Sequence, residues 1–253
     1  SPKRNSMLKQ PVFINSIASI SALGTSSDEI WNNYLHENSL FQQIDANQKH
    51  YWVSMFSEKE TKQLSEVILS DSKYKHLDKS VVMAILVARK CFENSRFSDK
   101  NVGINFGSSR GATSLFEKHH SDFISDGFVS TFTSPSTTLG NISSWVSHDL
   151  QTDGPEISHS ITCSTGLHAV LNGIAWLQSG MSSEFLVGAS EAPLTPFTLG
   201  QLSALKVYST EENALADRCL DFSKTSNTMV LGEAAACLSL SLLSETLLLK
   251  YQE

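Results

Sequence analysis

The sequence predicts an α/β fold in which a mixed sheet is covered by helices. Short apolar segments with strand periodicity alternate along the chain with longer segments in which apolar residues recur at helical spacing. The 253 residues are 40% hydrophobic and 18% charged, which is typical of a globular protein with one large or two small domains. We therefore expect an α/β domain with helices packed on a sheet.

The expected elements follow one another in a regular order. Strands are predicted at residues 11–19, 101–107, 156–162, 183–189 and 234–243. Helices are predicted at residues 27–36, 59–70, 79–94, 112–124, 136–149 and 164–179, with a loop and helix at 192–206. Residues 37–60 are predicted to be an irregular polar stretch, and they and residues 207–226 to be surface excursions. We expect the strands at 156–162 and 183–189 to be neighbours in one sheet.

The segment around Cys163 shows both periodicities. Upstream, Ile157, His159 and Ile161 alternate with polar residues, which predicts a strand. Downstream, apolar residues at three-to-four spacing before Gly180 predict a helix: Leu167, Val170, Leu171, Ile174 and Leu177. Cys163 would then lie on a sharp turn at the positive end of a helix, where the dipole favours a thiolate. This position is typical of a nucleophile; the alternative for Cys163 is a buried structural residue, which a lone cysteine usually is.

Composition excludes several classes of function. The net charge is −7 with only 19 basic residues, which argues against nucleic acid as a partner. The four cysteines, at 91, 163, 219 and 237, form no C-x-x-C pair, so neither a metal site nor a disulfide framework is expected, and a reducing cytoplasm fits best. We expect no cofactor.

The apolar stretch 234–249 is too short and too polar to span a membrane. Residues 1–6, before Met7, are interpreted as an artificial remnant.

Six further segments form a series of motifs along the chain. They are Val12-Phe13-Ile14 to Gly24 with Ile30 to Leu35, Val102 to Gly111, Ser134-Pro135-Ser136-Thr137, Gly154-Pro155, Val187-Gly188-Ala189-Ser190-Glu191 and Leu231-Gly232-Glu233-Ala234. With the cysteine turn they resemble, in order and spacing, the first half of the β-ketoacyl-acyl-carrier-protein synthases (ketosynthases). No single match is specific, but the series is.

The resemblance implies a thiolase-like fold reduced to about one half of the usual two-half layered architecture, formed by residues 7–253. It also implies Cys163 as the acyl-accepting nucleophile. In the family, two catalytic histidines and a Gly-Phe-Gly loop lie in the second half, and we expect none of them here. His159 and His168 are not expected to replace them, because His159 would lie about 13 Å from Cys163 along a strand and His168 is off the favoured helical spacing.

Departures inside the matching half support a loss of activity. Two family motifs, Arg-Pro-Phe-Asp and Asp-Gly-Phe-Val, are replaced by Leu220-Asp221-Phe222-Ser223 and Asn227-Thr228-Met229-Val230, and Gly-Glu-Gly-Ala-Gly by Gly232-Glu233-Ala234-Ala235-Ala236. Arg110 stands where the family has a small or apolar residue beside the acyl pocket. A guanidinium there either needs a partner or stops a hydrocarbon chain; the alternative is a turn residue that faces solvent.

The resemblance therefore predicts a non-catalytic, chain-length-factor-like subunit of fatty-acid, polyketide or polyene biosynthesis. It would form a heterodimer with a full-length ketosynthase and contact acyl carrier protein through that complex; an isologous homodimer is the alternative. The residues implied at the partner interface and acyl pocket are Thr133, Ser134, Pro135, Thr137, Ile157, His159 and Ile161.

Two other functions remain open. A catalytically competent subunit would use Cys163 to form a thioester, transfer the acyl group or carry out condensation. More remotely, Gly107-Ser108-Ser109-Arg110-Gly111 satisfies the G-x-S-x-G pattern of a serine hydrolase, with Ser109 as nucleophile. A hydrolase of that fold needs a late histidine, and none follows His168.

Overall fold

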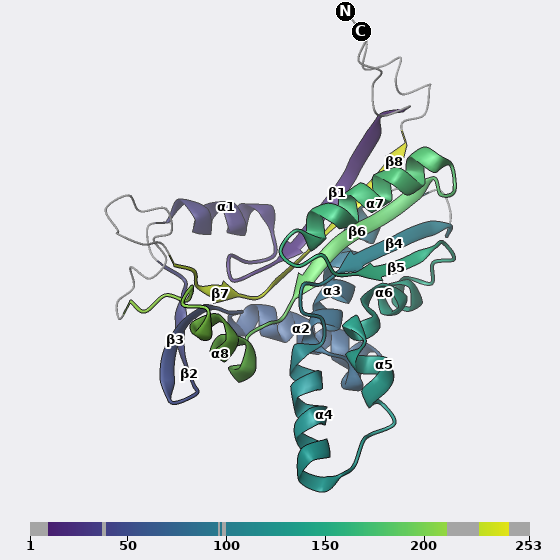
Figure 1. Ribbon diagram of the computed structural model, residues 1–253. Coiled ribbons are helices and arrows are strands. Elements are labelled where there is room, and N and C mark those ends of the chain that lie inside the picture. Colours follow the sequence, from purple (N-terminus) through teal and green to yellow (C-terminus); the bar gives the residue numbers. More distant parts are fainter. Residues whose placement is uncertain (1–9, 37–38, 96, 98–99, 212–227, 243–253) are drawn as a thin grey trace, which may run out of the picture.

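The computed structural model describes residues 10–36, 39–95, 97, 100–211 and 228–242 (Figure 1). Its centre is a five-stranded sheet in the order β1-β8-β6-β4-β5. The strands are β1 (Val12–Ile20), β8 (Ala234–Leu242), β6 (Glu184–Glu191), β4 (Val102–Gly107) and β5 (Glu156–His159). β8 pairs antiparallel with both β1 and β6, whereas β4 pairs parallel with β6 and β5. The predicted mixed sheet is confirmed.

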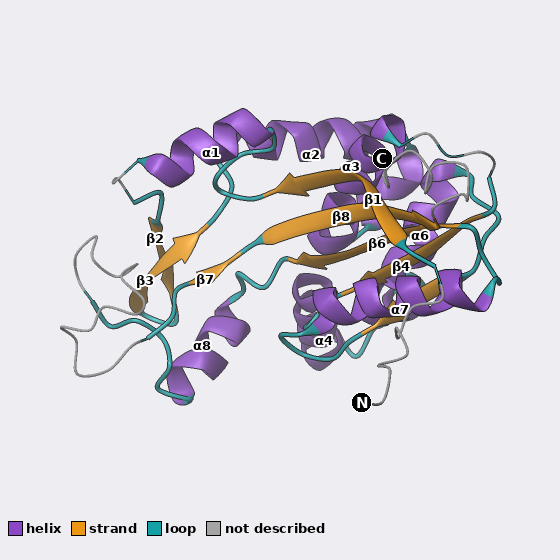
Figure 2. Cartoon of the chain, turned by 90° about the horizontal axis from the view of Figure 1, so that it is seen from above, coloured by secondary structure: helices purple, strands orange, loops and turns teal. Residues whose placement is uncertain are grey.

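Helices cover both faces of this sheet, and the alternation of side chains along β6 explains why. Phe185 and Val187 point to the face covered by α7 (Thr165–Ser179), while Leu186 between them packs with α3 (Lys79–Asn94) on the other face. α6 (Ile142–Leu150) lies beside α3. The sheet therefore lies between α3 and α6 on one face and α7 on the other (Figure 2).

Residues 37–60 were predicted to be irregular, and this is wrong because they contain a β-hairpin. β2 (Gln42–Ala46) and β3 (Lys49–Ser54) pair antiparallel, and β3 also pairs with the short strand β7 (Leu231–Gly232). Asn47 and Gln48 both have positive φ, at 54° and 61°, which suits a two-residue hairpin turn. Tyr51 and Val53 on β3 pack against α8 (Pro196–Ala204).

The predicted helix at 136–149 is confirmed over its second part and wrong over its first. The chain forms α5 (Thr133–Thr137), the short 3-10 helix η2 (Leu139–Asn141) and then α6. Leu139 and Asn141 have φ values of 47° and 51°, and a left-handed residue cannot continue a right-handed helix. The other helices match their predicted positions: α1 (Ser27–Leu35), α2 (Glu58–Ser70) and α4 (Thr113–Asp126), with an unpredicted 3-10 helix η1 (Ser72–His76).

The strand before the cysteine is shorter than predicted and has a different neighbour. β5 ends at His159, so residues 160–162 belong to the turn. β4 lies between β5 and β6, which shows that the expected pairing of 156–162 with 183–189 is wrong although both strands lie in one sheet. The connection through α7 passes over β4, as crossovers between parallel strands often do.

Several predictions lie outside the described residues. These are the remnant at residues 1–6, the replaced motif at 220–223, and Asn227. None of the described helices is both long and apolar enough to cross a membrane.

Candidate functional site

Cys163 lies in a tight turn between β5 and α7, and its side chain is exposed. Thr162, directly before it, has a φ of 47°, a left-handed conformation that is costly for a β-branched residue. Two hydrogen bonds close the turn, from Ser164 N to Ile161 O at 3.3 Å and from Thr165 N to Thr162 O at 3.2 Å. The predicted position of Cys163 at a strand-to-helix turn is confirmed.

Thr165 completes this turn and is not among the predicted site residues. Its hydroxyl donates to the Thr162 carbonyl at 2.6 Å and accepts a hydrogen bond from Ile161 N at 2.9 Å. Its methyl group packs against Gly107 of β4, where an added Cβ would lie 2.2 Å from Thr165 Cγ2. Gly107 therefore leaves the room that the side chain of Thr165 needs. A hydroxyl residue two positions after a candidate nucleophile is the signal that could have identified it.

Neither nearby histidine is bonded to the thiol. Cys163 Sγ has no hydrogen bond to any residue that the structure describes. His168 Nδ1 lies 3.0 Å from Ser164 O, and His159 interacts with Asn105 and with the carbonyl of Thr165. The thiol lies beside the N-terminal end of α7.

The turn after β4 lies next to the cysteine turn. Ser108 N donates to His159 O at 3.2 Å, and the Ser160 hydroxyl donates to Ser109 O at 3.1 Å. Glu191, at the end of β6, accepts hydrogen bonds from the N–H of Ser109 and the hydroxyl of Ser108. Burial raises the pKa of the Glu191 carboxyl, while these two donors act in the opposite direction.

Ser109 and Arg110 do not form the sites considered for them. Ser109 has no hydrogen bond to any histidine in the part of the chain that the structure describes, so the hydrolase hypothesis has no geometric support. Arg110 is exposed, and its guanidinium donates to Gln201 Oε1 of α8 at 2.7 Å. The structure therefore corresponds to the alternative in which Arg110 is a turn residue at the surface.

The predicted interface residues fall into two groups. On α5, Ser134 and Pro135 are exposed, Thr137 donates to Thr133 O at 2.6 Å, and the buried hydroxyl of Thr133 has no partner among the described residues. At the sheet, Ile157 and His159 are half-buried on β5, and Ile161 is 43% exposed in the turn beyond it. β5 is an edge strand of the described sheet.

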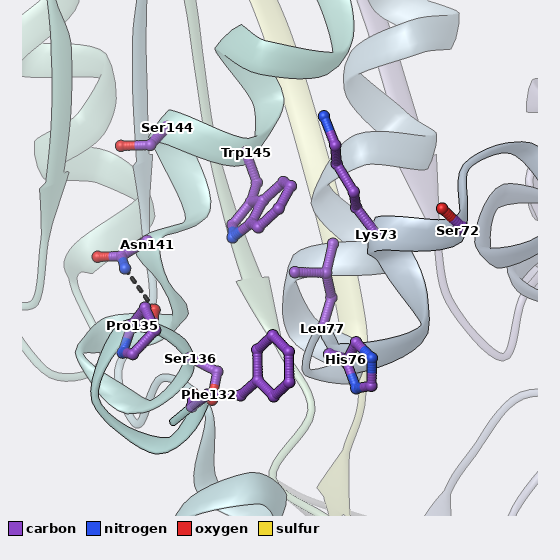
Figure 3. Close-up of a pocket in the computed structure, with 10 residues that line it drawn as sticks. All are labelled: Ser72, Lys73, His76, Leu77, Phe132, Pro135, Ser136, Asn141, Ser144 and Trp145. Atoms are coloured by element: carbon purple, nitrogen blue, oxygen red, sulfur yellow. Dashed lines mark hydrogen bonds between the residues drawn. The ribbon is translucent and has the colours of Figure 1, made fainter. Parts of the chain in front are cut away.

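A cleft of about 620 Å³ lies beside α5 (Figure 3). Phe132 and His76 stack at one wall, with ring centroids 4.5 Å apart and planes 7° from parallel. Trp145 of α6 and Leu77 form other apolar parts of the lining, and Lys73 lies at the η1 side. Across the described residues, no group of three or more His, Cys, Asp or Glu side chains is arranged to hold a metal ion.

The sequence matches one protein family along almost its whole length. The family model described as β-ketoacyl synthase, N-terminal domain, covers residues 9–246. The chain belongs to the ketosynthase family. The resemblance based on the motif series is thereby confirmed.

A curated ketosynthase relative is 3-oxoacyl-[acyl-carrier-protein] synthase 2 of Coxiella burnetii. It is 26% identical over 239 residues, which make up 91% of this chain and 58% of that protein. The chain thus spans little more than half the length of this relative.

Solved ketosynthase structures have the same fold. One, of a type II PKS acyl-carrier protein in complex with its ketosynthase bound to the hexaketide, matches with a TM-score of 0.75 at 18% identity, covering 92% of this chain and 58% of that one. Another, a ketosynthase in complex with its chain length factor from Xenorhabdus doucetiae, has a TM-score of 0.68 at 17% identity, with 93% and 59% covered. The thiolase-like fold is therefore confirmed.

Proposed function

We propose that this chain is a non-catalytic, chain-length-factor-like subunit that pairs with a full-length ketosynthase. The proposal rests on a continuous surface formed by β5, η2, α5 and α4. This surface contains exposed apolar side chains and the unpaired edge of β5. η2 contacts both β5 and α5, and α5 contacts α4, so the four elements adjoin one another.

The outer edge of β5 supplies one part of this surface. β5 pairs with β4 on one side, and no described strand pairs with it on the other. An edge strand presents unpaired N–H and C=O groups, which another strand can satisfy. The same strand from a related subunit, antiparallel about a two-fold axis, would pair with it. Ile157 and Ile161 would then lie at or beside the contact.

α4 supplies the second part. It is a helix of 14 residues in which no residue is buried, and it extends away from the body of the protein (Figure 1). Large apolar side chains are exposed on it and on the loop to α5: Phe116, Phe123, Ile124, Phe128, Val129 and Phe132. We call these six residues the α4 apolar surface. A helix with this exposure gains little stability from packing against the rest of its own chain, so a partner would stabilise it.

The relatives support the type of partner. A structural neighbour is described as a ketosynthase in complex with its chain length factor, and a second as a ketosynthase/chain length factor. Among the described residues, no basic side chain forms a hydrogen bond with the thiol of Cys163. This supports a role in assembly and pocket shaping over one in condensation. The described cysteines 91, 163 and 237 are free, which fits the reducing cytoplasm that we propose as its location.

Co-expression with each ketosynthase encoded nearby, followed by size-exclusion chromatography and mass determination, tests the proposal. We expect a one-to-one complex that the double substitution Phe128→Asp/Val129→Asp disrupts. Leu69→Asp is the control, because Leu69 is at least as exposed as Phe128 and Val129 but lies on α2. A chain that remains monomeric with every candidate ketosynthase, or forms only homodimers, would overturn the pairing.

The exposed thiol at the cysteine turn favours a second candidate function, acyl acceptance by Cys163. The Cys163 thiolate would attack the carbonyl carbon of a carrier-bound acyl thioester, form a new C–S bond and release the carrier thiolate, which then takes up a proton. Incubation with acyl-loaded carrier protein should add the acyl mass to the wild-type chain and not to Cys163→Ala. An unmodified wild type, alone and in complex, would exclude this role.

We propose the cleft beside α5 as a contact for the acyl carrier protein. Lys73, Lys75 and His76 give η1 a basic end, which would attract an acidic carrier despite the negative charge of the whole chain. Charge reversal at both lysines should weaken carrier binding to the complex, and more at low than at high salt. Equal binding by wild type and the variant at low salt would remove this contact from the proposal.

A further inference from the structure

A chain of polar side chains lies behind the cysteine turn and has no part in the function proposed so far. Asn172 of α7 donates through Nδ2 to Asn105 Oδ1 of β4 at 2.9 Å. Asn105 Nδ2 lies 2.9 Å from His159 Nδ1 of β5. His159 Nε2 lies 3.2 Å from the carbonyl oxygen of Thr165, at the start of α7. The network therefore links three elements and returns to the helix that follows Cys163.

The donors and acceptors in this network determine the tautomer of His159. The Thr165 carbonyl only accepts, so Nε2 carries the proton. Asn105 Nδ2 only donates, so Nδ1 is the unprotonated acceptor. The amide of Asn105 is held in this orientation because its Nδ2 also donates to Ile157 O at 2.9 Å. His159 is thus held as the neutral Nε2–H form, assigned from the network.

Asn105 makes this network part of the interior. Its side chain is completely buried on β4, and all of its hydrogen-bonding groups have partners: Oδ1 accepts from Asn172, and Nδ2 serves Ile157 and His159. Buried polar groups that are fully paired stabilise one arrangement over others, because any rearrangement leaves a donor or acceptor unsatisfied. The family resemblance implied that His159 lies at the partner interface, whereas its ring nitrogens are directed to β4 and α7.

Thr165 connects the network to the cysteine. The carbonyl of Thr165 binds His159, and the hydroxyl of the same residue holds the carbonyl of Thr162, which has left-handed backbone. Cys163 lies between Thr162 and Thr165. A loss of the bond to His159 would free one end of the turn, and the strained conformation of Thr162 would then be less well supported.

We propose that His159 is a positioning residue for Cys163. As the neutral Nε2–H form it holds Thr165, and through Thr165 the turn that presents the thiol at the positive end of α7. This inference deepens the acyl-accepting role proposed for Cys163. It concerns the geometry of the thiol, so it is tested without any acyl donor.

The test is the rate at which iodoacetamide alkylates Cys163 in the folded protein, followed by mass spectrometry of the Cys163 peptide. His159→Phe fills the space of the ring without either nitrogen. We expect alkylation about two- to fivefold slower, the effect of losing the stabilisation of an anion at a helix end. His159→Gln offers both an acceptor and a donor, and it should recover part of the rate.

Leu177→Ala is the control for general destabilisation, since Leu177 is buried at the other end of α7. If it slows alkylation as much as His159→Phe for the same loss of melting temperature, the positioning role is wrong. An unchanged rate in His159→Phe would also overturn it.

A second measurement keeps the proposal testable if His159→Phe does not fold. Long-range ¹H–¹⁵N spectra of the histidine-labelled wild type should show His159 as the neutral Nε2–H tautomer, and Asn105→Ala should weaken this preference, because only the Thr165 carbonyl then supports it. An Nδ1–H tautomer in the wild type would contradict the proposed network. Because neither measurement uses an acyl donor or a ketosynthase, a failure of the proposed function is distinguished from a failure of this inference.

Discussion

Lys79 and Glu233 form an ion pair with 2.6 Å between the ammonium nitrogen and the carboxylate oxygen, and Glu233 has only 2% of its side chain exposed. The other oxygen of Glu233 accepts a hydrogen bond from Phe56 N at 3.0 Å, and the Lys79 ammonium lies 4.9 Å from the centre of the Phe56 ring. The residue between β7 and β8 is thereby joined to the start of α3 and to the segment before α2.

Lys79→Ala is expected to destabilise the protein, because it leaves the buried carboxylate of Glu233 without its counter-ion. Breaking a fully buried pair costs about 3–5 kcal/mol. Lys79 is 42% exposed, so water screens the pair and we expect a loss of about 1–3 kcal/mol in the free energy of unfolding. Urea denaturation measures it. The exposed pair of Lys118 and Asp122 is the control, and an equal loss in Lys118→Ala would contradict the prediction.

Glu191 should make stability depend on pH. Burial raises its pKa above the ordinary value of 4.5, so the folded protein binds this proton more tightly than the unfolded chain does. The contribution of Glu191 to stability is therefore complete below the unfolded pKa and is lost as pH rises through the folded pKa. Glu191→Gln does not titrate and keeps an oxygen for Ser109 N. The stability of the variant minus that of the wild type should increase from about pH 4 to about pH 7; a constant or decreasing difference would refute this.

Gly188 of β6 should not tolerate a side chain. An added Cβ would lie 2.4 Å from the carbonyl oxygen of Ala236 on the paired strand β8 and 2.5 Å from Phe106 Cε1. We expect Gly188→Ala to lower the free energy of unfolding by about 1–3 kcal/mol, because the backbone of β8 has to shift. In Gly166→Ala the new Cβ would be 3.4 Å from Ala189 Cβ, an ordinary contact, within helix α7. Thermal unfolding of both variants should show the loss at Gly188 alone.

Alkylation of the native protein should distinguish Cys163 from Cys91 and Cys237. Cys163 is exposed, whereas Cys91 on α3 and Cys237 on β8 are completely buried. The reaction of a buried thiol requires local opening of the core, so we expect Cys163 to be alkylated at least about a hundredfold faster than the other two. Peptide mass mapping during a time course measures the three rates. Comparable rates before unfolding would mean that the core around β8 opens easily.

The sheet and most helices could be predicted from the sequence because their apolar residues follow the periods of strands and helices. The hairpin at 42–54 was missed because its turn residues, Asn47 and Gln48, lack the glycine that usually marks such a turn. The break between α5 and α6 was missed for a related reason. Leu139 and Asn141 adopt left-handed backbone, and neither a proline nor a glycine at those positions announces it.

At the candidate site, Cys163 could be found because a segment with strand periodicity ends, and one with helical periodicity begins, next to it. The network behind the cysteine could not, since its hydrogen bonds join residues 54 and 67 positions apart in the sequence. Such pairs leave no local pattern. The sequence assigned His159 to a face of the strand, but the packing of α7 against β4 directs its ring to Asn105.

The exposure of α4 is expected to shorten the lifetime of unassembled copies in the cell. Phe123, Ile124 and Phe128 are displayed on an element that has no buried residue of its own. Chaperones and proteases select such extended apolar sequences, and local opening of a weakly packed helix exposes its backbone for cleavage. Copies of this chain that have not assembled would therefore be degraded first, and the amount of the subunit would follow that of its partner.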